Sequence, residues 1–218
     1  MTNQSKLTVV LIGAGGHAAV VESAIIKGDE YFVFEILDDE KPPGTRVVRG
    51  KVLGGRKFLQ SAYDGGVRFA HVAIGDNTTR EAITQELEHI GFASATVRHP
   101  QAIIEEGVVI GHGAFLAAAS VIGARANIGR GCIINTAASV DHDCIIGDFA
   151  HVCPGARLAG DVHVGARTMI GTNATIIPGI RIGADVVIGA GAVVIRNVAD
   201  GRTVAGNPAR VVESRRES

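Results

Sequence analysis

The sequence predicts a small α/β domain with a parallel sheet, followed by a solenoid of short parallel β-strands. Two observations predict this fold class. Strand and helix patterns alternate before residue 98, and from residue 104 to 194 an aliphatic residue recurs at every sixth position. Composition agrees, because 46% of the 218 residues are hydrophobic but only 4% are aromatic, with 29 Gly and no Trp. A core of Ala, Val and Ile suits a thin, repetitive interior.

The first hundred residues are expected to form a Rossmann-like half domain, residues 1–98. Predicted strands cover 7–12, 31–37 and 69–74, with a further short strand near Ala95, and predicted helices cover 17–27, 54–63 and 78–89. This alternation indicates parallel strands joined by crossover helices. The length is sufficient for one mononucleotide-binding half of a doubly wound fold, and not for two.

A glycine-rich turn joins the first predicted strand to the first predicted helix. The residues expected to bind a nucleotide diphosphate and its ribose are Gly13, Gly15, Gly16, His17, Asp38 and Asp39. Backbone N–H groups at a helix N-terminus bind phosphate oxygens, and an acid after the second strand of a Rossmann domain binds a ribose. Two alternatives are a turn that serves only tight packing and a nicotinamide or flavin site.

The repeat occupies residues 99–196. Its sixteen periodic residues are Ile104, Ile110, Leu116, Ile122, Ile128, Ile134, Val140, Ile146, Val152, Leu158, Val164, Ile170, Ile176, Ile182, Ile188 and Val194. The residue two positions before each is nearly always small, and Gly follows eight of them. Such spacing is expected of short strands separated by tight corners, with alternate residues pointing inward. The glycine is predicted to serve the corner by positive φ or by close backbone approach.

This pattern resembles the hexapeptide-repeat family, which folds as a left-handed parallel β-helix with three sides and eighteen residues in each coil. The resemblance implies about five coils, because it covers sixteen hexads. An ordinary β-sandwich would not keep one period over so many units. Residues 197–218 are expected to leave the repeat as a C-terminal turn and tail.

Charge and cysteine content exclude several classes of protein. The formal net charge is -1 without a run of Lys or Arg, so neither nucleic acid nor an anionic membrane is an expected partner. The apolar run 7–13 is too short for a signal peptide or a membrane span, which predicts a cytoplasmic protein. Three cysteines without a CxxC spacing argue against a disulfide framework and a zinc ribbon.

The glycine turn, the acidic pair and the repeat together resemble the bacterial nucleotide-sugar N-acetyltransferases of the hexapeptide-repeat superfamily, including the bacillosamine-pathway enzymes. Sialic acid O-acetyltransferases are related. The resemblance covers the whole chain and implies an acetyl-CoA co-substrate, a homotrimer and an acceptor that is GDP-perosamine, which we prefer, or a UDP-4-amino sugar. Sugar O-acetylation and a Rossmann-type NAD-dependent or nucleotide-binding protein remain open.

A histidine followed by an acid, His142 and Asp143, is the candidate catalytic pair. An amine is mostly protonated at neutral pH, so its attack on a thioester needs a base, and a carboxylate beside an imidazole fixes the tautomer. Both residues are expected at an outward corner. The resemblance identifies His142 as the general base and Asn135 and Asp141 as flanking residues, which would bind the substrate amine or only shape the corner. A buried histidine with backbone partners is the alternative.

The resemblance also implies the residues around acetyl-CoA. They are His151 near the acetyl carbonyl, the Gly160 amide as the oxyanion donor, and Gly171, Gly189 and Arg210 along the CoA groove. His142 and His151 are nine residues apart, half of a coil, so they should project from different sides of the prism. This predicts active sites between subunits, with inactive His142 and Gly160 variants restoring activity when mixed. No metal is expected, because no HxxxxH pair is present.

Overall fold

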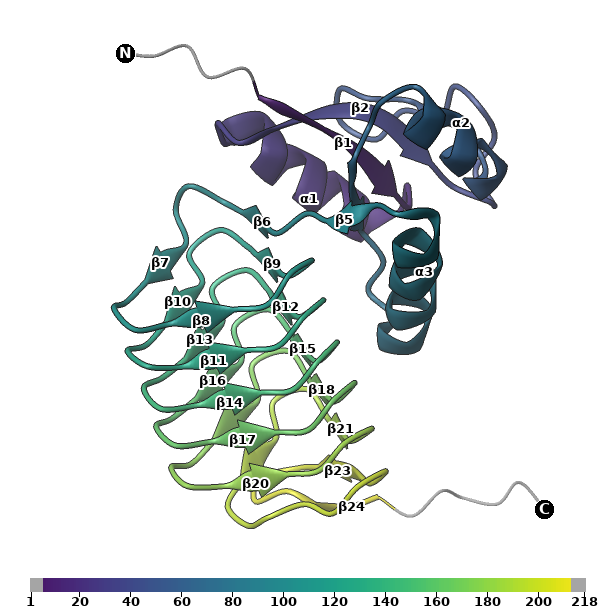
Figure 1. Cartoon of the computed structure of the whole chain (residues 1–218). Coiled ribbons are helices and arrows are strands. Elements are labelled where there is room, and N and C mark those ends of the chain that lie inside the picture. The colour runs from purple at the N-terminus through teal and green to yellow at the C-terminus, as the bar shows by residue number, and fades with distance from the viewer. Residues whose placement is uncertain (1–5, 213–218) are drawn as a thin grey trace, which may run out of the picture. The chain divides into compact units, whose positions relative to one another are not determined.

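The computed structural model describes residues 6–212. The chain divides into two compact units, residues 1–100 and 101–218. The first unit contains the α/β sheet, and the second contains the repeat (Figure 1).

The first unit is a five-stranded parallel sheet with the strand order β3-β2-β1-β4-β5. Its strands are β1 (Leu7–Ile12), β2 (Tyr31–Leu37), β3 (Val52–Gly54), β4 (Phe69–Val72) and β5 (Ala93–Ser94), followed by β6 (Val97–Arg98). Its helices are α1 (Gly16–Lys27), α2 (Leu59–Asp64), preceded by the 3-10 helix η1 (Arg56–Phe58), and α3 (Asn77–Ile90). The strands and helices predicted from the alternating pattern are therefore confirmed.

Two details of the first unit differ from the sequence prediction. The three-residue strand β3 was not predicted, because it lies in a glycine-rich stretch and is too short to show a period. It also takes Gly54, which the prediction placed in a helix. The core on one face of the sheet joins Val10 and Ile12 of β1 to Leu87 of α3.

The second unit is a left-handed β-helix built from two-residue strands, as the repeat predicted. The sixteen strands are β7 (Ile103–Ile104), β8 (Val109–Ile110), β9 (Phe115–Leu116), β10 (Val121–Ile122), β11 (Asn127–Ile128), β12 (Ile133–Ile134), β13 (Ser139–Val140), β14 (Ile145–Ile146), β15 (His151–Val152), β16 (Arg157–Leu158), β17 (His163–Val164), β18 (Met169–Ile170), β19 (Thr175–Ile176), β20 (Arg181–Ile182), β21 (Val187–Ile188) and β22 (Val193–Val194). Each strand ends on a periodic aliphatic residue, and these residues with the small ones two positions earlier form one continuous core.

Every third strand stacks in parallel on the same side of the prism (Figure 1). The first face runs from β7 to β22, the second from β8 to β20, and the third includes β9, β12, β15, β18 and β21. We call the corner between the first and second faces the first edge, that between the second and third faces the second edge, and that between the third and first faces the third edge. Residues eighteen apart therefore lie above one another.

The glycine that follows the periodic residue is needed for close approach and not for positive φ. A Cβ at Gly111 would lie 2.4 Å from the Arg130 nitrogen, and one at Gly165 would lie 2.4 Å from the Ala184 nitrogen, because the next coil passes directly beneath. Positive φ occurs two residues later instead, where non-glycine residues such as Arg125 also adopt it. The positive-φ alternative for these glycines was thus wrong.

The chain continues to stack on the last coil after the repeat ends. β23 (Thr203–Ala205) pairs in parallel with β21, and β24 (Arg210–Val211) pairs antiparallel with β23. The charged tail of the predicted C-terminal segment, from residue 213, lies outside the described residues.

Candidate active site

His142 and Asp143 follow β13 at the first edge of the prism, and both side chains reach solvent. The His142 side chain is 57% exposed, and its Nδ1 lies 2.8 Å from Oδ2 of Asp143. A carboxylate at this distance fixes Nδ1 as the protonated nitrogen and leaves Nε2 to accept a proton. The prediction of an outward-facing pair agrees with this geometry, and the alternative of a buried histidine does not.

Asp141 shapes the corner from which His142 projects. Its Oδ1 accepts a hydrogen bond from the backbone N–H of His142 at 2.7 Å. Asp141 therefore lies beside the base as predicted, with one oxygen used by the corner itself.

Arg125 is a member of this cluster that the sequence analysis missed. It lies one coil before Asp143, and its Nε and Nη2 donate to Oδ1 and Oδ2 of Asp143 at 2.7 and 2.8 Å. The Arg125 fork, followed by the His142 hydrogen bond, lowers the pKa of Asp143 to about 2. The available signal was the eighteen-residue spacing between two oppositely charged corner residues.

Gly160 lies one coil after His142 at the same edge. A Cβ at Gly160 would come within 2.5 Å of Cε1 and 2.6 Å of Nε2 of His142. The imidazole therefore packs directly on the glycine, and a side chain at position 160 would displace the ring from this position. No hydrogen bond from the Gly160 N–H is found within residues 6–212.

The expected rescue between His142 and Gly160 variants is incompatible with this arrangement. Residues eighteen apart stack at one edge, so His142 and Gly160 lie together at the first edge of one chain. A mixture of the two variants would contain no chain with an intact first edge. His142 and His151 are nine residues apart, half of a coil, and therefore lie on different sides of the prism. A rescue experiment should mix a variant of His142 with a variant of His151.

His151 belongs to a second cluster, beside the third edge. It lies on β15, and its Nε2 is 3.1 Å from Nδ2 of Asn135, which follows β12 on the coil before. Within one chain Asn135 therefore contacts His151, and its role beside the base of a shared site stays a prediction. Gly171 and Gly189 follow β18 and β21 at the same edge. Of the residues of the repeat that were predicted to bind CoA, His151, Gly171 and Gly189 thus lie at or beside the third edge, whereas Gly160 lies at the first edge.

Arg210 lies at the base of the solenoid, away from both clusters along the coil stack. It lines a hollow of about 240 Å³ together with Arg196 and Arg202. Its Nη1 donates to the carbonyl of Ala209 at 2.9 Å. Apolar residues such as Val194 and Val204 line the same hollow.

In the first unit, the glycine turn opens into a hollow of about 480 Å³. The hollow brings together all of the predicted nucleotide-binding residues, namely Gly13, Gly15, Gly16, His17, Asp38 and Asp39. Gly13 has a φ of +107°, and a Cβ there would lie 2.9 Å from the Ala73 carbonyl oxygen. Gly15 and Gly16 are exposed, with open space where a Cβ would be. The turn therefore presents the N-terminus of α1 to a ligand.

The two acids predicted to bind a ribose, Asp38 and Asp39, already have partners within the chain. Asp38 accepts hydrogen bonds from the backbone N–H of Ala14 at 2.7 Å and from those of Glu40 and Lys41 at 2.9 and 2.8 Å. Asp38 thus holds the glycine turn, whereas the acid of a dinucleotide site binds a ribose.

Asp39 pairs with Arg56, a lining residue that the sequence analysis missed. Arg56 donates to Asp39 from its backbone at 2.8 Å and from Nε at 2.6 Å, and it also pairs with Glu86 of α3. The backbone hydrogen bond from Arg56, followed by that from its side chain, lowers the pKa of Asp39.

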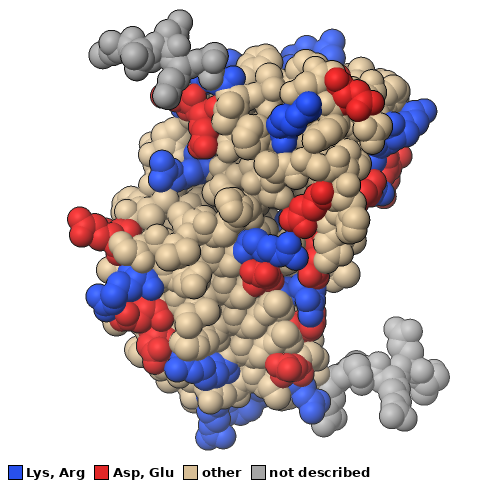
Figure 2. All heavy atoms as spheres, viewed as in Figure 1, with Lys and Arg blue, Asp and Glu red and all other residues tan. Residues whose placement is uncertain are grey.

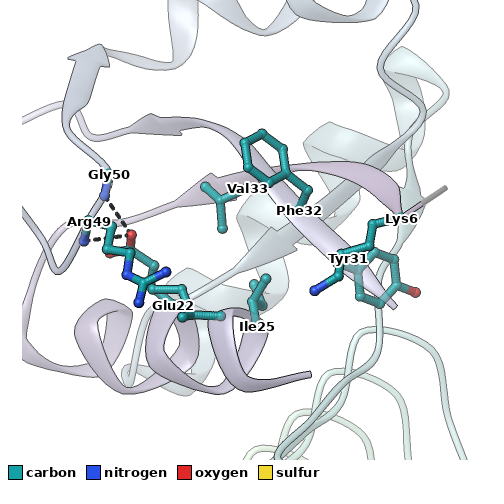
Figure 3. A pocket seen from close by; sticks show the side chains of 9 residues that line it. Lys6, Glu22, Ile25, Tyr31, Phe32, Val33, Arg49 and Gly50 are labelled. Atoms are coloured by element: carbon teal, nitrogen blue, oxygen red, sulfur yellow. Dashed lines mark hydrogen bonds between the residues drawn. The ribbon is translucent and has the colours of Figure 1, made fainter. Parts of the chain in front are cut away.

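A second hollow of the first unit, about 300 Å³, has a structural explanation (Figure 3). Tyr31 and Phe32 contribute to its mostly apolar lining. Its buried carboxylate, Glu22 of α1, accepts hydrogen bonds from the backbone N–H groups of residues 48, 49 and 50 at 2.7, 3.0 and 2.6 Å. Glu22 therefore anchors the loop before β3, and its charge is satisfied without a ligand.

Basic and acidic side chains are interspersed on the visible face, without a continuous basic patch (Figure 2). Among residues 6–212, no helix has the length and apolar character needed to cross a membrane. The same residues contain no group of three or more His, Cys, Asp or Glu that would hold a metal ion.

Comparison with known proteins connects both units to one family. The PglD N-terminal domain family matches residues 8–87, and the bacterial transferase hexapeptide family (six repeats) matches residues 161–196. No significant match was found among curated protein sequences.

Solved structures match over nearly the whole chain. PerB from Caulobacter crescentus, in complex with CoA and GDP-perosamine, is 38% identical over 94% of this chain and 97% of that one, with a TM-score of 0.90. The acetyltransferase domain of PglB from Neisseria gonorrhoeae FA1090, in complex with acetyl coenzyme A, is 36% identical over 95% and 100%, with a TM-score of 0.88. WeeI from Acinetobacter baumannii AYE is 28% identical over 95% and 100%, with a TM-score of 0.82.

Two relatives above 30% identity that match the full length establish the family predicted from the sequence. The glycine-turn half domain, the hexapeptide solenoid and the outward His142–Asp143 pair are found in one chain. The chain therefore belongs to the bacterial nucleotide-sugar N-acetyltransferases of the hexapeptide-repeat superfamily, and it is a CoA-dependent acyltransferase.

Proposed function

We propose that the protein transfers the acetyl group of acetyl-CoA to the 4-amino group of a nucleotide-linked sugar, with GDP-perosamine as the preferred acceptor. The observation that carries the proposal is the His142–Asp143 pair packed on Gly160, because it provides a base whose Nε2 has no hydrogen-bond partner among residues 6–212. PerB, the relative solved with GDP-perosamine and CoA, supports the choice of acceptor. The required substrates also lead us to infer a cytoplasmic location.

In the proposed reaction, the sugar amine attacks the thioester carbonyl and His142 Nε2 takes the proton that the amine loses. The C–S bond then breaks, and the CoA sulfur leaves and receives the proton held by the His142 imidazolium, which restores the base. Asp143 holds Nδ1 and stabilises the imidazolium while it exists. The Gly160 N–H is the proposed donor to the oxyanion, a contribution typically of about 3 kcal/mol to the barrier.

Release of the CoA thiol tests the function directly. Acetyl-CoA would be offered with a panel of GDP-, UDP- and dTDP-linked amino sugars and with the matching hydroxy sugars. We expect thiol release with the amino sugars, fastest with GDP-perosamine. Faster release with the hydroxy sugars would show O-acetylation instead, and NAD(H) binding without acetyl-CoA turnover would favour a redox enzyme.

The active site is proposed to lie between neighbouring subunits of a homotrimer. His142 and Gly160 occupy the first edge of one chain, whereas His151, Gly171 and Gly189 occupy the third edge. The first face separates the two edges, so one acetyl group would have to meet edges from different chains. The three arginines at the solenoid base, including Arg210, are proposed to bind the CoA phosphates.

Mixing two inactive variants should restore activity. One variant is His142→Asn, and the other carries Asn135→Ala and His151→Ala together, which removes the pair joined at 3.1 Å. After subunit exchange at equal amounts, about a quarter of the interfaces would carry two intact edges, so about a quarter of the wild-type activity is expected. Activity that stays at the level of the separate variants, after exchange verified by mass spectrometry, would contradict a shared site.

Nucleotide binding at the glycine turn can be tested with a charge placed at the helix N-terminus. Gly15 is the N-cap of α1 and has open space around its Cβ position. Asp and Asn are both good N-cap residues, so neither should destabilise the helix. The carboxylate of Gly15→Asp should repel the diphosphate and raise KM for the nucleotide sugar about tenfold or more above that of Gly15→Asn.

The neutral variant is the matched control, since it has the same size and the same capping ability. KM for acetyl-CoA should stay the same in both variants. Equal KM values for the nucleotide sugar in the two variants would exclude a diphosphate at this turn.

A further inference from the structure

The proposed base, His142, is hydrogen-bonded to the Asp143 carboxylate, and Arg125 binds the same carboxylate. Oδ2 of Asp143 accepts from both His142 Nδ1 and Arg125 Nη2, each at 2.8 Å, while Oδ1 accepts from Arg125 Nε at 2.7 Å. A bidentate guanidinium fixes the plane and the rotation of a carboxylate. The direction in which Asp143 presents its shared oxygen, and hence the orientation of the imidazole, depends on Arg125.

The solenoid contains a second pair with the same geometry but without a histidine. At the second edge, Arg167 Nε and Nη2 donate to Oδ1 and Oδ2 of Asp185 at 2.7 and 2.8 Å, again across eighteen residues. All four residues of the two pairs have positive φ. Ala184 stands before Asp185, where His142 stands before Asp143. A bidentate Arg–Asp pair can therefore join two coils without a histidine. The pair at the first edge differs in that its aspartate also binds His142.

Other charged groups near the base are already engaged. Asp141 binds the backbone N–H of His142 through Oδ1. Asp161, on the coil after, lies 3.4 Å from Nε2 of His163 and 3.4 Å from Nη1 of Arg181. Arg125, on the coil before, is the cation that reaches the Asp143 carboxylate.

We propose that Arg125 is a positioning residue for the His142 base. Its guanidinium orients Asp143 so that Nε2 of the imidazole faces the amine, and its charge offsets that of the carboxylate. The inference rests on the proposed role of His142. The low pKa of Asp143, about 2 and caused first by Arg125, is consistent with this arrangement.

The test compares Arg125→Met, Arg125→Lys and the control Arg167→Met in thiol-release kinetics across about pH 5.5 to 9. Arg125→Met should lower kcat about tenfold and move the acidic limb of the kcat profile about half a pH unit upward, because an unbalanced carboxylate holds the proton on the imidazole more strongly. Arg125→Lys keeps the charge but loses the fork, so the limb should stay in place while kcat falls. Arg167→Met should change neither.

Thermal unfolding separates the kinetic effect from a loss of stability. Both Arg-to-Met variants remove a solvent-exposed ion pair, so their Tm values should be similar. If Arg125→Met is unfolded, the comparison of kcat between Arg125→Lys and the wild type tests the inference in its place. Profiles of the Arg125 variants that superimpose on that of Arg167→Met would overturn the inference.

A parallel measurement of His142→Asn keeps this outcome distinct from failure of the base assignment. Wild-type turnover in His142→Asn would refute the base itself. Loss of turnover in His142→Asn, with unchanged Arg125 variants, would refute only the role of Arg125. The double variant with Arg125→Met should show no loss of rate beyond that of His142→Asn alone, because the two residues act as one unit.

Discussion

Replacement of His142 by asparagine is expected to lower kcat at neutral pH by about 10³-fold, the usual contribution of a positioned general base. Asparagine preserves the size and a hydrogen-bonding group toward Asp143, but it cannot take a proton from the amine. KM for both substrates should change little, since the base acts mainly in the transition state. Initial rates of thiol release would measure both constants.

His163→Asn is the matched control for this substitution. His163 also lies near an aspartate, with its Nε2 3.4 Å from Oδ1 of Asp161. It lies on strand β17, whereas His142 lies at a corner. Its replacement should leave kcat within about twofold of the wild type, because His163 contacts Asp161 and not the His142–Asp143 pair. A His142→Asn enzyme that turns over as fast as His163→Asn would show that the amine is deprotonated elsewhere.

Gly160→Ala is expected to lower kcat by about 10²-fold without unfolding the protein. The added methyl group would lie 2.5 to 2.6 Å from the His142 ring, so the imidazole must leave the position in which Asp143 holds it. The clash is with a half-exposed side chain that can rotate away, and the coil itself need not shift. Kinetics and thermal unfolding of the same preparation would check both parts.

Ala124 shows that the first edge tolerates a methyl group at this position of the coil. It stands one coil before His142, at the place equivalent to that of Gly160. The reciprocal variant Ala124→Gly should therefore leave kcat within about threefold of the wild type. A Gly160→Ala enzyme with normal kcat and normal Tm would mean that the position of the His142 ring on Gly160 does not matter for catalysis.

The repeat sequence was sufficient to predict the solenoid, because its period reflects a local rule. Each strand must bury the periodic residue and the small one before it, so the pattern of Val140 and Ala138 is repeated in every hexad. The α/β unit was also predictable from alternating patterns, except for β3. Three residues in a glycine-rich stretch carry too little pattern, and their pairing with β2 comes from the sheet.

The candidate site was predictable only in part. His142, Asp143 and the glycine turn are neighbours along the chain, and the half-coil spacing placed His151 on another side of the prism. The neighbours of Gly160 and Asn135 lie on adjacent coils, so chain order alone does not reveal them. Asn135 contacts His151, which is sixteen residues away in the sequence, and Gly160 lies against His142, which is eighteen residues away in the sequence.

The sequence by itself thus determined the coil period, the elements of the first unit and the outward histidine–acid pair, since all of these follow from local burial and chain order. The tertiary structure alone decided which charges meet. It placed Arg125 on Asp143, Arg56 on Asp39 and Asp38 on the glycine turn. The physical reason is that side-chain pairing depends on stacking between coils and on strand order, which join residues far apart in the chain.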